Sequence, residues 1–171
     1  MSPTPRTANK TTTIITPAND GDVAIIAELA QRIWPVAYGP ILSEEQISNL
    51  LGAIYNHDNL RNEMQGGHRF WLALADGVPV GFASAYLQDH VMWLRKLYVL
   101  PKAQGCGIGK QLLHRLYAAF PEAGEARLLV NTNNRPAQQF YERMGFCAID
   151  EVPVKMGDFS FIDLVFSRAL S

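Results

Sequence analysis

The chain has 171 residues, of which 48% are apolar, and its formal net charge is −1. A chain of this length can bury roughly two-thirds of its unfolded surface, so we expect a single domain. Acids and bases are intermixed, which excludes the basic surface typical of nucleic-acid or membrane binding. No apolar run approaches the ~20 residues of a membrane-spanning helix, and the polar N-terminus lacks the apolar core of a secretory signal.

The two cysteines, Cys106 and Cys147, are too few for a disulfide framework or a structural zinc site. We expect both to be reduced in a cytoplasmic protein that holds no metal, with Cys147 buried. Residues 1–12 are polar and rich in threonine. We expect a flexible leader over 1–12 and one domain over 13–171.

The first half of the chain predicts one strand followed by three helices. A β-branched run at 13–15 predicts the strand, which we expect Pro17 to stop. Apolar residues at helical spacing predict a helix over 20–33, which Pro35 should interrupt. Two further helices are predicted over 43–54 and 58–65.

The second half of the chain combines strands and helices. Asp76-Gly77 is a hairpin turn signal, and Pro101 ends a strand because proline cannot donate to a ladder. The predicted strands cover 70–75, 80–87, 91–100, 127–131, 146–154 and 159–166, and the predicted helices cover 108–120 and 136–144. Meander strands followed by a β-α-β-α-β unit indicate an α/β (α+β) domain.

The glycine-rich loop Gln104–Gly109 lies between a predicted strand and a predicted helix. Glycines allow close approach of a ligand, and the free amides at a helix N-terminus favour a phosphate. A Walker loop is excluded because Gln111 cannot supply a hydroxyl for magnesium, and the glycine spacing does not match a Rossmann fingerprint. A plain glycine-rich turn remains the alternative.

Two segments carry a resemblance to a known family. Leu97–Pro101 followed by Gln104–Gly109 resembles the acetyl-CoA motif, Gln/Arg-x-x-Gly-x-Gly/Ala, of the GNAT N-acetyltransferase superfamily. Asn134–Phe146 resembles that superfamily's Asn-x-x-Ala…Phe-Tyr-Glu…Gly-Phe segment. The resemblance implies a single domain with a central mixed, mostly antiparallel sheet of about six to seven strands flanked by helices.

The same resemblance implies an N-acetyltransferase that moves an acetyl group from acetyl-CoA to a primary amine in a ternary complex. Backbone groups of Leu97 and Val99 would pair with the pantetheine arm or the acetyl carbonyl, and loop amides would hold the pyrophosphate. Asn134 would bond the cofactor, and Tyr141 would face the thioester sulfur. The implied cofactor-binding residues are Leu97, Tyr98, Val99, Gln104, Gly105, Cys106, Gly107, Ile108, Gly109, Lys110, Asn134, Ala137 and Tyr141.

Tyr141 is the candidate catalytic acid. A phenol of pKa ~10 is a credible proton donor for a leaving thiolate of pKa ~8.5. The alternative interpretation is an aromatic side chain that only packs beside Phe140.

The sequence does not identify the general base that would deprotonate the acceptor amine. An alkyl ammonium of pKa ~10.4 is neutral in only about one molecule in two thousand at pH 7, so a base would help. Many GNAT relatives carry a glutamate on the strand before the glycine loop, where this chain has Trp93. Asp89 and His90 are substitute hypotheses, each with a solvated turn as the alternative, and Glu142 is another.

The acceptor is expected to lie under the segment 33–55. Trp34 and Tyr38 would bind a cationic amine there or would be ordinary core. The C-terminal segment with Asp158 and Asp163 resembles the spermine/spermidine-acetylating branch, so these acids would attract a polyamine or would be surface acids. Protein N-terminal or lysine acetylation, and non-catalytic acyl-CoA sensing, are the alternatives. The resemblance also implies a homodimer through the terminal strands.

Overall fold

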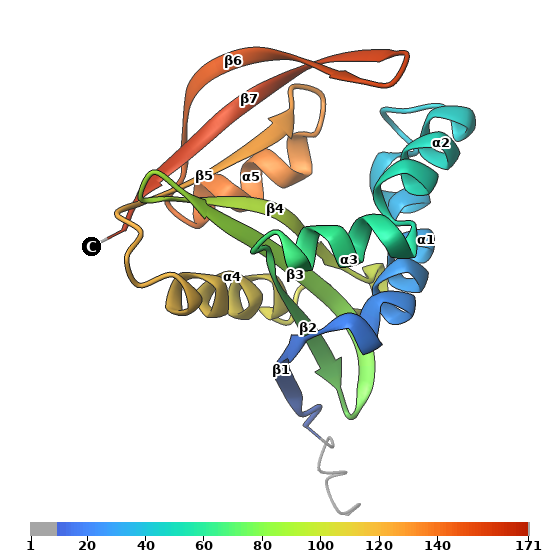
Figure 1. Cartoon of the computed structure of the whole chain (residues 1–171), viewed down its shortest axis with the longest axis vertical. Coiled ribbons are helices and arrows are strands. Elements are labelled where there is room, and N and C mark those ends of the chain that lie inside the picture. Colours follow the sequence, from blue (N-terminus) through green and yellow to red (C-terminus); the bar gives the residue numbers. More distant parts are fainter. Residues whose placement is uncertain (1–9, 171) are drawn as a thin grey trace, which may run out of the picture.

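The structure is a computed structural model and describes residues 10–170. Seven strands form one sheet in the order β1-β2-β3-β4-β5-β7-β6 (Figure 1). Only β4 and β5 pair in parallel, and the other neighbours are antiparallel. This confirms the expected mixed, mostly antiparallel sheet. Of the expected leader, residues 1–9 lie outside the described residues.

The elements follow one another as the sequence predicted. The strands are β1 (Thr13–Ala18), β2 (Arg69–Ala75), β3 (Val78–Gln88), β4 (Val91–Val99), β5 (Glu125–Asn131), β6 (Cys147–Met156) and β7 (Phe159–Ala169). The helices are α1 (Val23–Tyr38), α2 (Glu44–Ile54), α3 (His57–Gln65), α4 (Ile108–Ala119) and α5 (Arg135–Arg143). Helix α4 packs on β2, β3 and β4, while α1 packs on β3 and β4 beside α2 and α3. Within residues 10–170, no helix combines the length and apolar character needed to cross a membrane.

Two prolines do not end their elements, contrary to the sequence-based expectation. Strand β1 continues through Pro17 to Ala18, because an edge strand leaves one row of backbone groups without a partner and needs no N–H there. Helix α1 continues through Pro35 to its end. Pro35 cannot donate to the carbonyl of Gln31, but Gln31 is exposed and water can satisfy that carbonyl.

Strands β4 and β5 pair over only part of their length. Their register runs to the pair Leu94–Leu128, after which no further pairing joins them. At the same place the register between β3 and β4 shifts, with Ser84 opposite Lys96 and Ala85 opposite Leu94. Arg95 is therefore an extra residue, and such a β-bulge bends its strand and increases the local twist. Strands β4 and β5 separate just beyond this bulge.

A buried ion pair joins α3 to β4 next to the bulge. Lys96 is 3% exposed, and its Nζ lies 2.6 Å from Oε2 of Glu63. The rings of Tyr55 and Phe70 surround the ammonium, with centroids 5.6 and 5.5 Å from Nζ. Burial lowers the pKa of Lys96, and the Glu63 carboxylate opposes that shift. The charge on Lys96 therefore depends on Glu63.

Replacing Glu63 alone should destabilise the protein. Glu63→Gln leaves the Lys96 charge buried without a partner, and we expect a loss of about 3–5 kcal/mol in the free energy of unfolding by denaturant titration. The double variant Glu63→Leu/Lys96→Met should stay much closer to wild type, because it buries no charge.

The exposed acid Asp58 on the same helix is the matched control. It pairs with Arg61 at 3.8 Å on the surface, so Asp58→Asn should cost less than about 1 kcal/mol. Equal effects of the two substitutions in α3 would contradict a buried charge pair.

Candidate functional site

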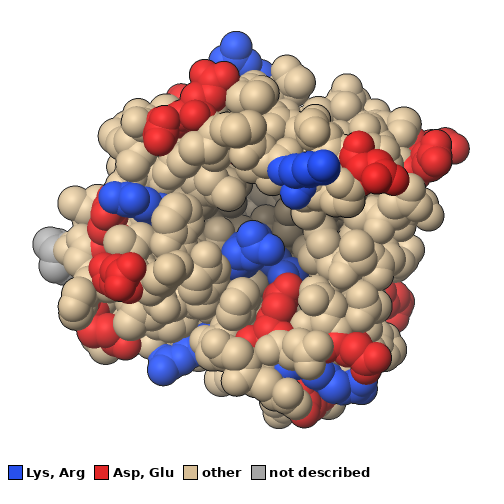
Figure 2. Space-filling view, turned by 45° about the horizontal axis from the view of Figure 1, so that its top comes forward, with Lys and Arg blue, Asp and Glu red and all other residues tan. Residues whose placement is uncertain are grey.

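A cavity of about 160 Å³ lies where β4 and β5 separate. Its walls come from α1, α2, β4, β5, α5, β6 and β7, so both halves of the chain contribute. The space-filling view shows this face hollowed near its centre, with basic atoms in the hollow (Figure 2). Arg95 and Lys96 of the bulged part of β4 are the basic residues of the lining.

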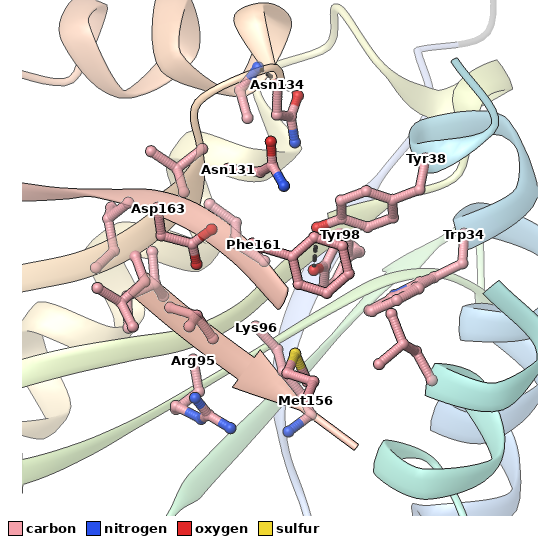
Figure 3. Close-up of a pocket in the computed structure, with 18 of the residues that line it drawn as sticks. Trp34, Tyr38, Arg95, Lys96, Tyr98, Asn131, Asn134, Met156, Phe161 and Asp163 are labelled. Atoms are coloured by element: carbon pink, nitrogen blue, oxygen red, sulfur yellow. Dashed lines mark hydrogen bonds between the residues drawn. The ribbon is translucent and has the colours of Figure 1, made fainter. Parts of the chain in front are cut away.

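The two sequence motifs meet at this cavity. Five of the predicted cofactor residues line it together, namely Leu97, Tyr98, Asn134, Ala137 and Tyr141. Figure 3 labels two of them, Tyr98 and Asn134. The first two belong to β4 and the others to the N-terminal cap and body of α5. The pairing of β4 with β5, followed directly by α5, brings these distant segments together.

The edge of β4 that β5 leaves is open for a ligand. The Leu100 amide donates to the Val80 carbonyl of β3 at 2.7 Å, so every second residue of β4 faces β3. The alternate residues Leu97 and Val99 therefore direct their backbone groups to the open edge. The Gln104 side chain already donates to the Val99 carbonyl at 3.1 Å and ties the glycine loop to this edge.

The glycine loop has the backbone geometry of an anion site. Gly105 and Gly107 have φ values of 83° and 78°, in the left-handed region that favours glycine. The first amide bonded within α4 is that of Gln111, which donates to the Gly107 carbonyl at 3.0 Å. The preceding amides of Ile108, Gly109 and Lys110 have no partner within the helix, as at any helix start. The loop lies outside the cavity lining, on the surface beside it.

Gly109 serves a different purpose from the other loop glycines. A Cβ placed there would lie 3.2 Å from the Phe140 ring of α5. The glycine therefore lets the start of α4 pack closely on the second motif.

Asn134 is the N-cap of α5. Its Oδ1 accepts from the Ala137 amide at 3.3 Å, which leaves the amide NH₂ at the cavity wall. Gln138 is buried and donates to the carbonyls of Asn131 and Thr132, each at 3.0 Å. These bonds fix the connection between β5 and α5.

Tyr141 both packs and lines the cavity, so the two interpretations of this residue are compatible. Its ring lies edge-on to Phe140 and Phe146, with centroids 5.2 and 5.7 Å away. Burial raises the pKa of Tyr141 well above its usual value. The phenol is therefore protonated at every physiological pH and can donate a hydrogen bond into the cavity.

Aromatic residues line another side of the cavity, and one acid lies across from them. The hydroxyls of Tyr38 and Tyr98 are hydrogen-bonded at 2.7 Å, and the Trp34 ring lies 4.5 Å from that of Tyr38 (Figure 3). Asp163 of β7 lines the cavity, and burial raises its pKa. Asp158, the other acid expected to attract a polyamine, lies in the exposed turn between β6 and β7.

Several sequence-based candidates lie elsewhere. Trp93, at the position expected for a glutamate, is outside the cavity lining, and its ring lies 6.0 Å from the Arg127 guanidinium carbon. Asp89 and His90 form an exposed left-handed turn at the far end of β4, with φ of 51° and 63°. Cys147, expected to be buried, is exposed because little covers the edge strand β6.

Residues that the sequence analysis did not single out also line the cavity. They are Arg95, Lys96, Asn131 and Phe161 (Figure 3). Lys96 could have been noticed because it is a charged residue within a largely apolar predicted strand. No comparable signal marks Asn131 or Phe161, because the register of β5 with β7 places them at the cavity.

Comparisons with known proteins agree with this geometry. Residues 24–146 match the Acetyltransferase (GNAT) family. The chain is 33% identical over 129 residues to an uncharacterized N-acetyltransferase of Mycobacterium bovis, covering 73% of this chain and 83% of the relative. It is 30% identical over 132 residues to a spermidine N(1)-acetyltransferase of Thermoplasma acidophilum, covering 73% and 82%.

A solved structure extends the likeness over nearly the whole fold. The crystal structure of the PaiA N-acetyltransferase from Thermoplasma acidophilum in complex with coenzyme A superimposes with a TM-score of 0.80 and 26% identity, covering 93% of this chain and 99% of that one. The chain therefore belongs to the GNAT acetyltransferase family. It is an acyltransferase, an N-acetyltransferase that uses acetyl-CoA.

Proposed function

We propose that the protein transfers an acetyl group directly from acetyl-CoA to a primary amine of a small molecule, with a polyamine as the favoured acceptor. The observation that carries this proposal is that donor-side and acceptor-side residues line one shared cavity at the fork of β4 and β5. Donor-side groups of Leu97 and Tyr141 and acceptor-side groups of Trp34 and Asp163 surround the same space. Donor and acceptor bound there would be in contact, so no acetylated enzyme is required.

The described residues fit the shape and charge of the donor. We assign the pantetheine arm to the open edge of β4 at Leu97 and Val99, where backbone groups lack strand partners. The pyrophosphate is assigned to the glycine loop and the start of α4, where free amides and the helix dipole favour an anion. Asn134 and Ala137 line the same cavity as Leu97, and we assign both residues to the donor as well.

Tyr141 is assigned to the leaving sulfur. Its raised pKa makes complete proton transfer to a thiolate of pKa ~8.5 unfavourable. The role that fits is hydrogen-bond donation, which stabilises negative charge as it develops on sulfur.

The likeness to a spermidine acetyltransferase supports the choice of acceptor class. The aromatic wall and the single carboxylate of the described cavity lining are suited to a cationic amine.

An acceptor screen tests the function. Release of CoA thiol from acetyl-CoA would be followed with monoamines, diamines, spermidine and a peptide bearing a free N-terminus. We expect turnover with the aliphatic amines, fastest with the polyamine. Turnover with the peptide alone would replace the proposal by protein acetylation. Tight acetyl-CoA binding by calorimetry with no turnover on any amine would replace it by acyl-CoA sensing.

Removing one hydroxyl tests the role of Tyr141. Tyr141→Phe should lower kcat about 10²-fold, because the developing thiolate loses its hydrogen-bond donor. Its affinity for acetyl-CoA, measured by calorimetry, should stay unchanged. Tyr117→Phe is the control, since that hydroxyl meets Arg168 outside the cavity. Full turnover by Tyr141→Phe would refute the assignment.

A side chain at Gly107 tests the phosphate loop. Gly107→Val should raise the Kd for acetyl-CoA at least about tenfold, because the valine occupies the space in front of the free amides. Gly77 offers a matched control. Its φ is 80°, against 78° at Gly107, and at both positions a Cβ meets no atom within 4 Å. Gly77→Val therefore introduces similar strain far from the loop and should leave the Kd unchanged, and equal Kd values for both variants would exclude a phosphate site.

A further inference from the structure

The acceptor half of the cavity contains one carboxylate. Among the described residues that line the cavity, Asp163 is the only acid. Figure 3 shows its carboxylate pointing into the cavity from the side opposite Trp34 and Tyr38. Strand β7 holds it there by pairing with β5 on one side and β6 on the other.

The Asp163 carboxylate has no partner in the protein. Within residues 10–170 no side chain or amide donates a hydrogen bond to it, and no cation lies within ion-pair distance. Burial raises its pKa, and no neighbouring cation opposes that shift. Lys96 lines the same cavity but is paired with Glu63. A half-buried acid of this kind has its hydrogen-bonding capacity free for a ligand.

Asp163 also lies at the level of the open strand edge. The last pair between β4 and β5 is Leu94–Leu128. Three residues further along each strand come Leu97 and Asn131, and Asn131 is directly opposite Asp163 on β7. Leu97 is the residue whose backbone we assign to the donor. The carboxylate therefore lies across the fork from the part of β4 that we assign to the donor.

The surroundings of Asp163 match an ammonium group. Trp34, Tyr38 and Phe161 present aromatic rings to the cavity, and such rings attract a cation. An alkyl ammonium has three donors, of which one suits the carboxylate. The cation would also supply the charge partner that Asp163 lacks.

We propose that Asp163 binds the ammonium form of the acceptor and removes one of its protons, so that it is the general base of the reaction. This inference rests on the proposed amine acetyltransferase function. It also answers the question that Trp93 raised, because the base comes from β7 rather than from β4.

The step balances in protons and bonds. One N–H bond of the ammonium breaks, and its proton moves to an oxygen of Asp163. The free amine attacks the thioester carbon, forming the C–N bond while the C–S bond breaks. The second amine proton ends on the CoA thiol, whose sulfur accepts the Tyr141 hydrogen bond as it leaves. Asp163 then releases its proton to solvent.

The test compares Asp163→Asn with wild type on two acceptors. With a strongly basic alkyl amine, kcat/KM should fall about 10²–10⁴-fold, the usual contribution of a general base. With a fluorinated alkyl amine that is already neutral at pH 7, the loss should be less than about tenfold, because no proton has to be removed first. Asp158→Asn, which removes an exposed acid of the same segment, should behave as wild type.

The pH profile separates a base from a structural residue. Wild-type kcat/KM on the basic amine should be level above the pKa of Asp163 and up to that of the amine. In Asp163→Asn it should rise about tenfold per pH unit, because only the free amine reacts. The other ionisable or charged groups of the cavity are Tyr38, Arg95, Lys96, Tyr98 and Tyr141. Burial raises the pKa of each of the three tyrosines.

The outcomes distinguish the two proposals. Wild-type inactivity on every amine would overturn the proposed function and this inference with it. Wild-type activity with Asp163→Asn within about threefold would overturn the inference alone. An equal loss on both acceptors, with unchanged acetyl-CoA affinity and unfolding midpoint, would make Asp163 a binding group and refute its role as base.

Discussion

The separation of β4 from β5 is the constraint on which the rest of the site depends. Beyond Leu94 β4 leaves β5 but stays paired with β3, so closely that a Cβ on Gly81 would lie 2.8 Å from the Tyr98 carbonyl oxygen. The bulge at Arg95 bends β4 just after its last pair with β5. The unpaired edge, the cavity and the cap of α5 all follow from this divergence, since α5 and β7 are both attached to β5.

Two polar contacts made by residues of the cavity wall connect the helices to β4. The Lys96–Glu63 pair ties α3 to the bulged strand, and the Tyr38–Tyr98 hydrogen bond ties α1 to the same strand. Each partner is substantially buried, so separating either pair leaves a polar group without a hydrogen bond in an apolar environment. These contacts therefore fix the positions of α1 and α3 relative to β4. The acceptor wall is thereby kept at a fixed distance from the donor edge.

The donor half of the site that we propose makes demands on the backbone that few residues satisfy, so the sequence carries a signal for it. The left-handed Gly105 and Gly107, and Asn134 as a helix cap, each leave a recognisable pattern in a short stretch of chain. The acceptor half depends on register, which the sequence does not display. Asp163, which the resemblance singled out, reaches the cavity through the pairing of β7 with β5, whereas Trp93, at the position expected for a glutamate, lies outside the cavity lining. The effects of the two prolines inside β1 and α1 were mispredicted. A proline is tolerated in an edge strand, or in a helix where the carbonyl it leaves free is exposed to water, and both conditions depend on the tertiary structure.

Burial has opposite consequences for the proposed roles of Tyr141 and Asp163. It raises the pKa of both Tyr141 and Asp163, because each loses solvation of its charged form. The same shift makes the phenol a weaker acid and the carboxylate a stronger base. A thiolate of pKa ~8.5 leaves without a strong acid, whereas an ammonium of pKa ~10.4 cannot react until it loses a proton. The site is therefore suited to removing a proton from the acceptor ammonium, whereas the leaving sulfur needs only a hydrogen bond. Burial in the same cavity makes Asp163 a stronger base and keeps Tyr141 protonated.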